Sequence, residues 1–348
     1  MNERNGAMVR EFYVSGYAEL GEKGIIRYRI DTDKKTIDEI GSVTCIENPT
    51  YMVPHPNGHV IYSGEKHKGE AEVVSFLLED AGAHVTRKLG TGGISACHIS
   101  LDPTCEYLFA ANYATGSLAV FSLGSDGSLL ERTDFRQFEG HGADPVRQDR
   151  PHLHFALCTG ETVYACDLGQ DVVWVFDFDR NTGKLIDTDR NIHVRPGDGP
   201  RHLAIHSAHP EYLYLITEMA STVYVLKDNG NGYETVQTIS SIPADYDGPE
   251  NTAAAIRFSE DGTRLLVSNR GHDSIAVFQV TESGTLLPAV FSSSGGTGPR
   301  DFNVFGDLVV TSNQYSGDVV VYELDGLTLR DTGIRSNAGH PSCVQPVL

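Results

Sequence analysis

The sequence predicts an all-β protein, a seven-bladed β-propeller, and a repeated segment is the first observation behind this prediction. The segment ends one apolar strand, turns through small or polar residues and starts a second strand, as in Asn269–Phe278. Aligned copies place Asn112, Asp167, Thr217, Asn269 and Asn313 at one position, separated by 55, 50, 52 and 44 residues. A period of about 40–50 residues built of short strands is typical of propeller blades.

A second repeated feature is a hairpin that precedes each of these segments. Turn sequences such as Pro56-Asn57-Gly58 and Glu260-Asp261-Gly262 stand between two runs rich in strand-forming residues. Each blade therefore reads as four antiparallel strands, a to d, joined by short turns. Six complete blades begin near Pro49, Ala96, Pro151, Pro200, Ala253 and Pro299.

The third observation is a blade divided between the two chain ends. The N-terminal part supplies strands b, c and d at Phe12–Ser15, Ile25–Ile30 and Thr36–Val43, and the C-terminus supplies a lone strand a at Pro341–Val347. Joining them closes the ring and leaves no free sheet edge. We expect one propeller domain over residues 11–348, preceded by a flexible tail over residues 1–10.

The charge of the chain restricts its partners. Lys and Arg number 27 and Asp and Glu 47, a formal net charge of −20, which opposes binding to nucleic acid and to anionic membranes. No apolar run approaches the roughly 18 residues of a membrane span, and the N-terminus does not resemble a signal peptide. We expect a cytoplasmic protein, a monomer or weak homodimer, in which the six cysteines are unpaired thiols.

The candidate site follows from the topology. The start of every strand a and the end of every strand b lie on the same face of the disc, around the central channel. At the strand-a starts stand His98, His152, His154, Arg201, His202, Asn251 and Arg300, and at the strand-b ends stand Glu65, Asn112, Asp167, Glu218, Arg270 and Gln314. Convergent polar groups on a concave face predict a binding site.

These residue types support acid–base chemistry on a small anionic or sugar-derived substrate. Arginines bind carboxylate or phosphate through two parallel hydrogen bonds, and histidine exchanges a proton near neutral pH. Glu218 has three possible roles: a base, a group that orients water, or a counter-ion for His152. The sequence contains no Gly-x-Ser-x-Gly motif and no ligand spacing typical of zinc or calcium, so we expect neither a metal nor another cofactor.

At these residues the chain resembles the seven-bladed propeller lactonase family, which includes the propeller type of 6-phosphogluconolactonase and the carboxy-cis,cis-muconate lactonizing enzyme. The resemblance covers about residues 12–347. Its most specific segments are Gly199–Ala204 with Glu218, Asn269–Phe278, Pro299–Phe302, Ala111–Tyr113 and Pro151–His154. The chain departs from the family in having Thr217-Glu218 where Asn-Glu is usual.

The resemblance implies that His152, Glu218, Arg201 and Arg270 are catalytic, with His152 preferred over His154 because it lies 15 residues before Asp167. The remaining candidates, expected to bind substrate, are His98, Asn112, His154, His202, Arg300, Gln314 and Glu65. We expect the catalytic side chains to face solvent at the channel mouth. The leading hypothesis is hydrolysis of a sugar-acid lactone, 6-phosphogluconolactone or a relative. A cofactor-free lactonizing cycloisomerase and a non-catalytic binding scaffold are the alternatives.

Overall fold

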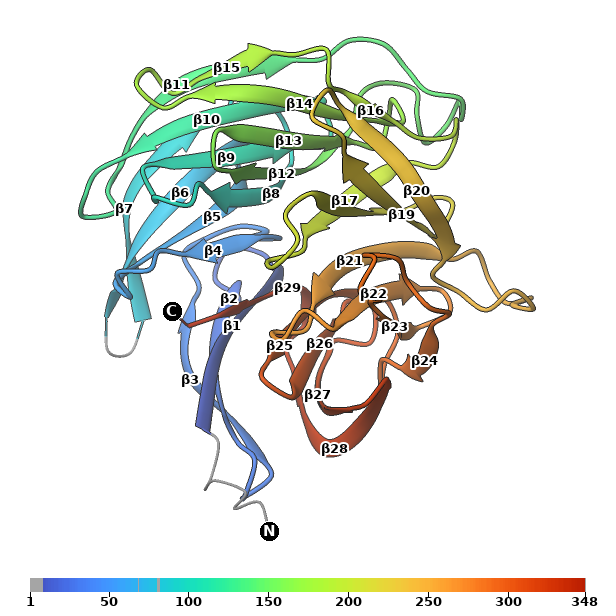
Figure 1. Cartoon of the computed structure of the whole chain (residues 1–348). Coiled ribbons are helices and arrows are strands. Elements are labelled where there is room, and N and C mark those ends of the chain that lie inside the picture. Colours follow the sequence, from blue (N-terminus) through green and yellow to red (C-terminus); the bar gives the residue numbers. More distant parts are fainter. Residues whose placement is uncertain (1–8, 68, 80–81, 348) are drawn as a thin grey trace.

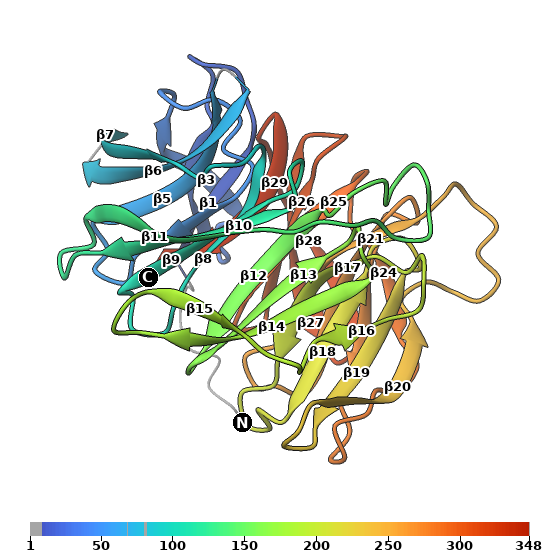
Figure 2. The same ribbon diagram turned by 90° about the horizontal axis from the view of Figure 1, so that it is seen from above.

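The structure, a computed structural model, describes residues 9–67, 69–79 and 82–347, which form seven β-sheets arranged in a ring (Figure 1). The sheets follow one another in chain order, and the turned view shows the last strand returning beside the first ones (Figure 2). The predicted seven-bladed propeller is therefore confirmed. Most of the predicted N-terminal tail lies outside the described residues, but Val9 and Arg10 already form the start of the first strand.

We number the blades 1 to 7 from the blade that contains both chain ends. The innermost strands are β29 (His340–Pro346), β4 (Met52–Pro54), β8 (Ala96–Leu101), β12 (Leu153–Thr159), β17 (Pro200–Ile205), β21 (Thr252–Phe258) and β25 (Pro299–Phe305). The second strands are β1 (Val9–Tyr17), β5 (Val60–His67), β9 (Tyr107–Asn112), β13 (Thr162–Asp167), β18 (Tyr212–Thr217), β22 (Arg264–Arg270) and β26 (Leu308–Asn313).

The outer strands complete the blades. The third strands are β2 (Ile25–Asp31), β6 (Glu70–Glu79), β10 (Ser117–Leu123), β14 (Val172–Asp179), β19 (Thr222–Asp228), β23 (Ser274–Gln279) and β27 (Asp318–Asp325). The outermost are β3 (Thr36–Val43), β7 (Gly82–Gly90), β11 (Leu129–Gln137), β15 (Lys184–Asp187), β20 (Tyr233–Ser240), β24 (Val290–Ser293) and β28 (Thr328–Asn337). Blade 4 adds β16 (Ile192–His193), which pairs with β14 beside β15, so its outer edge consists of two short strands.

The divided blade closes the ring as the sequence predicts. β29 pairs antiparallel with β1, with Val344 opposite Val14 and Pro346 opposite Phe12. Phe12, Val14 and Val344 are buried together with residues of blade 7 such as Val319. The chain ends therefore contribute both a hydrogen-bonded edge and part of a core between blades.

The strands of a blade are buried on both faces, because each blade packs against two neighbours. In β10, Ala119 and Phe121 belong to the apolar cluster shared with blade 2, whereas Leu118 and Val120 belong to the cluster shared with blade 4. Burial on both faces explains why these strands read as nearly continuous apolar runs. Within the described residues, there is no helix long and apolar enough to cross a bilayer.

Short polar turns fix the loops that lead into the next blade. Asp171 has a positive φ of 56° at the end of the turn before β14, and its carboxylate accepts hydrogen bonds from the N–H groups of Gly197 and Gly199 just before β17. Asp273, with φ of 54°, accepts one from Gly298 just before β25. These turns hold the starts of β17 and β25 in place.

The six cysteines are unpaired, as expected. Cys158, Cys166 and Cys343 are buried, Cys97 and Cys105 are half-buried, and Cys45 is exposed.

Candidate active site

The inner strands carry β-bulges near their first residues. In blade 4, Leu153 pairs with Asp167 and Phe155 with Cys166, so His154 between them has no partner in the neighbouring strand. The same shift leaves one extra residue in four other blades, namely Ser342, Cys97, Arg201 and Arg300. Blade 6 has a register shift at the same place, over Ala254 and Ala255. We call these the bulge positions; bulges commonly redirect a side chain beside an active site.

A second set of equivalent residues is found on the second strand of each blade. Each of them directly follows the residue that pairs with the innermost strand just before the bulge. Pro200 pairs with Thr217, for example, and Glu218 follows. We call these the strand-end positions, and they are Tyr17, Tyr113, Leu168, Glu218, Arg270 and Gln314.

The bulge and strand-end positions of blade 2 are identified from the sequence and from one hydrogen bond. Pro49-Thr50-Tyr51 aligns with Pro200-Arg201-His202, which makes Thr50 the bulge position. The N–H of Gly64 donates to the carbonyl of Tyr51. Lys66 lies two residues beyond Gly64 and is therefore the strand-end position.

The two sets surround one cavity of about 440 Å³. The bulge positions that line it are Thr50, Cys97, His154 and Arg300, and the strand-end positions that line it are Tyr17, Lys66, Tyr113, Glu218 and Arg270. The predicted convergence of strand starts and strand ends on one face is thus seen in the structure, and the volume lies in the range of small-molecule sites.

Glu218 is the centre of the charged network in this cavity. Its Oε2 atom is 2.9 Å from Nε of Arg201 and 2.8 Å from Nη2 of Arg270, and its Oε1 atom is 2.5 Å from Nη2 of Arg147. Burial alone would raise the pKa of Glu218, but the charges of Arg270 and Arg201 outweigh it and hold this pKa well below its usual range. The carboxylate is therefore ionised throughout the neutral pH range.

The catalytic candidates are more enclosed than expected. Only 2% of Arg201, 5% of Glu218 and 6% of Arg270 is exposed. The expectation that they face solvent is therefore wrong: the bulges and the guanidinium contacts hold them inside the channel. Arg270 also donates from Nε and Nη2 to the carbonyls of Thr252 and Ala253, and its Nη1 atom has no partner within the described residues.

Arg147 was not among the sequence candidates. It lies in the loop between β11 and β12, where Asp144 accepts hydrogen bonds from the N–H groups of Val146 and Arg147. Gln148 ties the same loop to the carbonyl of Leu168. The longest step in the repeat, 55 residues from Asn112 to Asp167, marks an insertion in this blade and was the available indication.

The two histidines at the start of blade 4 have different surroundings. His152 does not line the cavity: its Nδ1 atom is 2.9 Å from the carbonyl oxygen of Tyr113, and its Nε2 atom is 3.2 Å from Oδ1 of Asp149. His154 lines the cavity together with Glu218, and its buried Nδ1 atom has no hydrogen-bond partner among the described residues. His154, and not His152, thus lines the cavity, and the catalytic role of His152 stays a prediction.

His154 is held as a neutral imidazole. Burial and the charge of Arg201 lower its pKa well below 6.5, while Glu218 acts in the opposite direction. A neutral imidazole is the form that accepts a proton from water.

The other candidates fall into three groups. Glu65 and Arg300 line the cavity, and Gln314 supports Arg300 by accepting a hydrogen bond at 3.2 Å. His98 and His202 lie deeper, with ring centroids 5.4 Å apart and with their pKa values lowered by burial. Asn112 is fully buried and bonded to Thr91 and Ser117, a contact that joins strands rather than a substrate contact.

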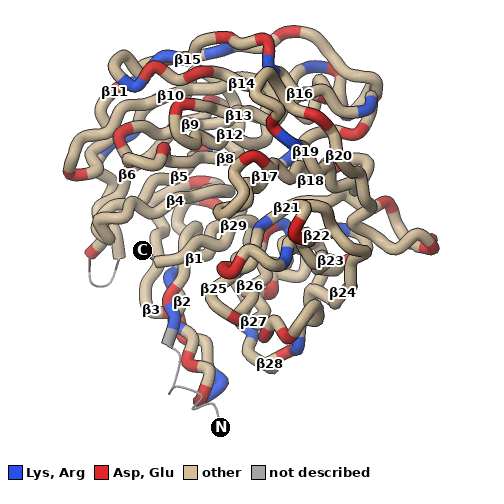
Figure 3. The backbone as a smooth tube through the Cα atoms, in the orientation of Figure 1, with Lys and Arg blue, Asp and Glu red and all other residues tan. Residues whose placement is uncertain are grey.

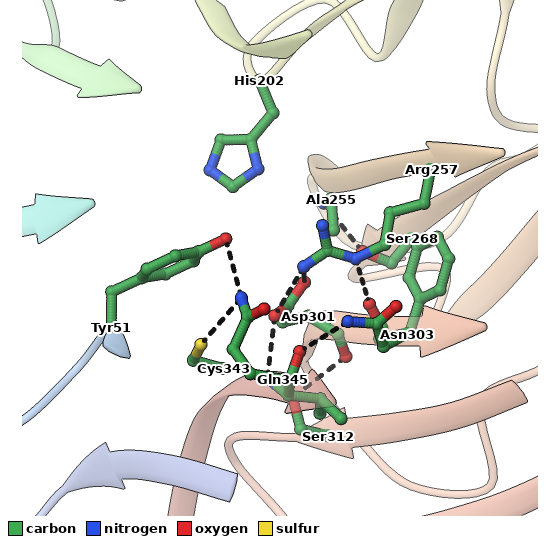
Figure 4. Close-up of polar contacts among 12 residues, drawn as sticks. Tyr51, His202, Ala255, Arg257, Ser268, Asp301, Asn303, Ser312, Cys343 and Gln345 are labelled. Atoms are coloured by element: carbon green, nitrogen blue, oxygen red, sulfur yellow. Dashed lines mark hydrogen bonds and ion pairs between the residues drawn. The ribbon is translucent and has the colours of Figure 1, made fainter. Parts of the chain in front are cut away.

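A separate polar cluster surrounds Asp301 (Figure 4), which shares a small hollow with His154 and Arg300 of the cavity. Arg257 pairs with both oxygens of Asp301, at 2.7 and 3.0 Å, and Gln345 donates to the hydroxyl of Tyr51. The amide of Val344 in the closing strand donates to Asp301 at 2.9 Å. We call Arg257, Asp301 and their partners the deep cluster.

The cavity is locally positive in an acidic protein. Asp and Glu are spread over all the blades (Figure 3). Four arginines nevertheless gather at the site, namely Arg147, Arg201, Arg270 and Arg300. Glu65, the second carboxylate that lines the cavity, is already paired with Lys88. Across the described residues, no group of three or more His, Cys, Asp or Glu side chains is placed to hold a metal ion.

Comparison with known proteins assigns the family of this chain. Residues 11–346 match the model of the family described as lactonase, seven-bladed β-propeller, and the chain belongs to this family. It is a lactonase, a hydrolase of the 6-phosphogluconolactonase-like kind.

Individual relatives agree with this assignment. The chain is 34% identical over 345 residues to the 6-phosphogluconolactonase of Bacillus subtilis, covering 96% of this chain and 97% of that protein. A crystal structure from Lactobacillus plantarum is similar, with a TM-score of 0.90, 30% identity and coverage of 97% and 99% of the two chains. The periplasmic gluconolactonase of Pseudomonas aeruginosa has a TM-score of 0.89, 27% identity and coverage of 97% and 99%.

Proposed function

We propose that the protein hydrolyses a sugar-acid lactone, 6-phosphogluconolactone or a relative, by general base catalysis from His154 with oxyanion stabilisation by Arg270. The observation that carries the proposal is the juxtaposition, in one cavity, of a neutral imidazole, a guanidinium with an unused nitrogen and a surplus of positive charge.

The reaction begins with attack of water on the lactone carbonyl carbon. The water loses a proton to His154 as its oxygen bonds to carbon, and the carbonyl π electrons move to oxygen. Nη1 of Arg270 donates to this oxyanion; a single such donor is typically worth about 10²–10³-fold in rate.

Collapse of the tetrahedral intermediate completes the hydrolysis. The electron pair returns to the carbonyl, the bond to the ring oxygen breaks, and the leaving alkoxide takes the proton from the His154 imidazolium. The product is the open-chain hydroxy acid, which ionises to its carboxylate, so one water is consumed and neither metal nor redox chemistry enters the balance.

Glu218 is assigned a positioning role rather than the role of base. Its depressed pKa makes the carboxylate a poor proton acceptor, and its oxygens are used by three guanidinium groups. Glu218 fixes the orientation of Arg270 and adds a negative charge that stabilises the imidazolium of His154. Arg201 and Arg147 in turn hold Glu218.

An anionic substrate is also expected to change the pKa of the base, His154. In the free protein, Arg201, Arg300 and Arg270 all lower the pKa of His154. A bound anion offsets these charges and moves the pKa of His154 upward, toward the value at which a base works best near neutral pH. The base is therefore expected to be stronger in the complex than in the free protein.

The test compares the two neighbouring histidines. In a pH-stat assay corrected for spontaneous ring opening, His154→Asn is expected to lower kcat on 6-phosphogluconolactone by about 10²–10⁴-fold, the usual contribution of general acid–base catalysis. His152→Asn is the matched control and is expected to lose less than about tenfold. Wild-type rates in His154→Asn would refute the mechanism, and turnover of a carboxymuconate but of no lactone would favour the cycloisomerase.

A further inference from the structure

Two cations of the cavity have no carboxylate partner among the described residues. Arg300 donates from Nη1 to Oε1 of Gln314 at 3.2 Å, and its guanidinium lies 5.8 Å from the ring centroid of Tyr17. Lys66 is exposed at the cavity wall, and its Nζ atom makes no hydrogen bond or ion pair within the described part of the chain. By contrast, Arg147, Arg201 and Arg270 all pair with Glu218.

Arg300 and Lys66 lie in the sector of the cavity around blade 1. Arg300 is the second residue of β25 in blade 7 and Lys66 is the last but one of β5 in blade 2, so they flank blade 1 and its Tyr17. In a ring of seven blades, this sector faces blades 4 and 5, which carry His154 and Glu218. A substrate whose carbonyl lies at His154 therefore extends its far end toward Arg300 and Lys66.

The wall next to these cations contains neutral polar residues and one carboxylate, Glu65, which is paired with Lys88. Asn48, Thr50 and Ser95 line the same cavity and supply amide and hydroxyl groups suited to sugar hydroxyls. The cavity thus contains three kinds of surface: reacting groups, neutral hydrogen-bonding groups and unpaired cations.

Building on the proposed function, we propose that Arg300 and Lys66 bind the phosphate of a phosphorylated sugar lactone, remote from the reacting carbonyl, and determine a preference for phosphorylated over neutral lactones. A phosphate monoester carries nearly two negative charges and three acceptor oxygens at neutral pH. The planar fork of an arginine fits two of these oxygens, and a lysine supplies a point charge for the third.

The experiment measures kcat and KM for 6-phosphogluconolactone and for glucono-δ-lactone, its neutral counterpart. Arg300→Gln is expected to lower kcat/KM on the phosphorylated lactone about 10- to 100-fold, mainly through KM, as for loss of a charged hydrogen bond that binds ground state and transition state alike. The loss on the neutral lactone is expected to be at least about tenfold smaller. Lys66→Gln is expected to act in the same direction but less, because Lys66 is exposed.

Two further variants serve as controls. Arg300→Lys keeps the charge without the fork and is expected to recover part of the lost affinity. Lys23→Gln removes a lysine from the neighbouring hollow, which shares Tyr17 with the cavity but where Lys23 is paired with Glu39, and is expected to leave both substrates unaffected. A thermal transition close to that of the wild type establishes that each variant is folded.

Each outcome decides between the two proposals. Equal losses on both lactones, or no loss on either, would overturn the phosphate subsite while leaving lactone hydrolysis intact. If the wild-type protein opens neither lactone, the proposed function fails, and calorimetry with 6-phosphogluconate and gluconate then tests the subsite without turnover. Tighter binding of 6-phosphogluconate that is lost in Arg300→Gln would support it, and equal binding of the two acids would overturn it.

Discussion

The channel contains two buried charged clusters that differ in how completely their hydrogen bonds are satisfied. In the deep cluster, Arg257 and Asp301 match one to one, Arg257 also donates to the carbonyl of Phe302, and Asp301 accepts from the amide of Val344 (Figure 4). At the cavity, three guanidiniums share the carboxylate of Glu218, and the buried Nδ1 atom of His154 has no partner in the part of the chain that the structure describes.

The difference in pairing suggests a structural role for the deep cluster and a ligand-binding role for the cavity cluster. A fully paired buried network fixes the positions of the strands that carry it. An incompletely paired network keeps donors and charge available for a ligand, at a cost in stability. The two clusters lie in one channel and use the same residue types, so composition alone does not distinguish them.

The largest expected effect comes from removing the strand that closes the ring and supports the deep cluster. Deleting residues 341–348 takes away Val344 from the deep cluster and Ser342 from the bulge positions, and it exposes the edge of β1. We expect the truncated chain to lose its cooperative thermal transition, because an unpaired edge and an open core face remain. A transition equal to that of the full chain in differential scanning calorimetry would disprove ring closure by β29.

A pair of single substitutions tests the division between the clusters. Asp301→Ala leaves the half-buried Arg257 without its carboxylate and is expected to cost about 2–4 kcal/mol of unfolding free energy, below the full value for a buried pair because Arg257 is partly exposed, with little change in kcat per folded molecule. Glu218→Gln is expected to lower kcat/KM by about 10²-fold, because Arg270 loses its fixed position, and to cost less stability than Asp301→Ala. Denaturant unfolding gives the free energy of unfolding of each variant, and lactone kinetics give its kcat/KM.

The division between the two clusters would be wrong if Asp301→Ala mainly lowered activity or if Glu218→Gln left activity unchanged. A large loss of activity in folded Asp301→Ala would place the deep cluster in the reaction. Normal kinetics in Glu218→Gln would remove the cavity network from it.

The smallest expected effect is on the pH profile. A lowered pKa keeps His154 neutral, and so able to accept a proton, at pH values where an ordinary histidine is protonated. We therefore expect kcat/KM, which reports the free enzyme, to stay level as the pH falls to 6.5 and to decline only below it. A decline centred above pH 6.5 that persists in His152→Asn would contradict the assignment of His154 as the base.

The blades and their closure were predictable because alternation and turn chemistry determine them locally. Thr36–Val43 was predicted with the bounds that β3 has, and the closing strand was predicted to within one residue at each end. The gathering of Arg201, Glu218 and Arg270 was also predictable, since antiparallel topology alone places strand starts beside strand ends.

The sequence is least informative where the regular pattern is interrupted. The strand pairing shows that Leu153, two residues after Pro151, corresponds to Pro200, and the histidine equivalent to Arg201 is therefore His154. Arg147 reaches Glu218 from a loop without periodicity, whose path depends on hydrogen bonds of Asp144 and Gln148. The burial of the site follows from packing around the channel, which neither propensity nor spacing encodes.

The recurring bulge separates the residues that fold a blade from those that gather around the channel. A bulge residue belongs to neither face of the alternating strand, so its identity can change while the apolar pattern and the ladder stay intact. Serine, threonine, cysteine, histidine, alanine and arginine all occur at this place in the seven blades. New substrate ranges are therefore accessible by substituting a handful of equivalent sites, each altered independently, on an architecture that does not need to be redesigned.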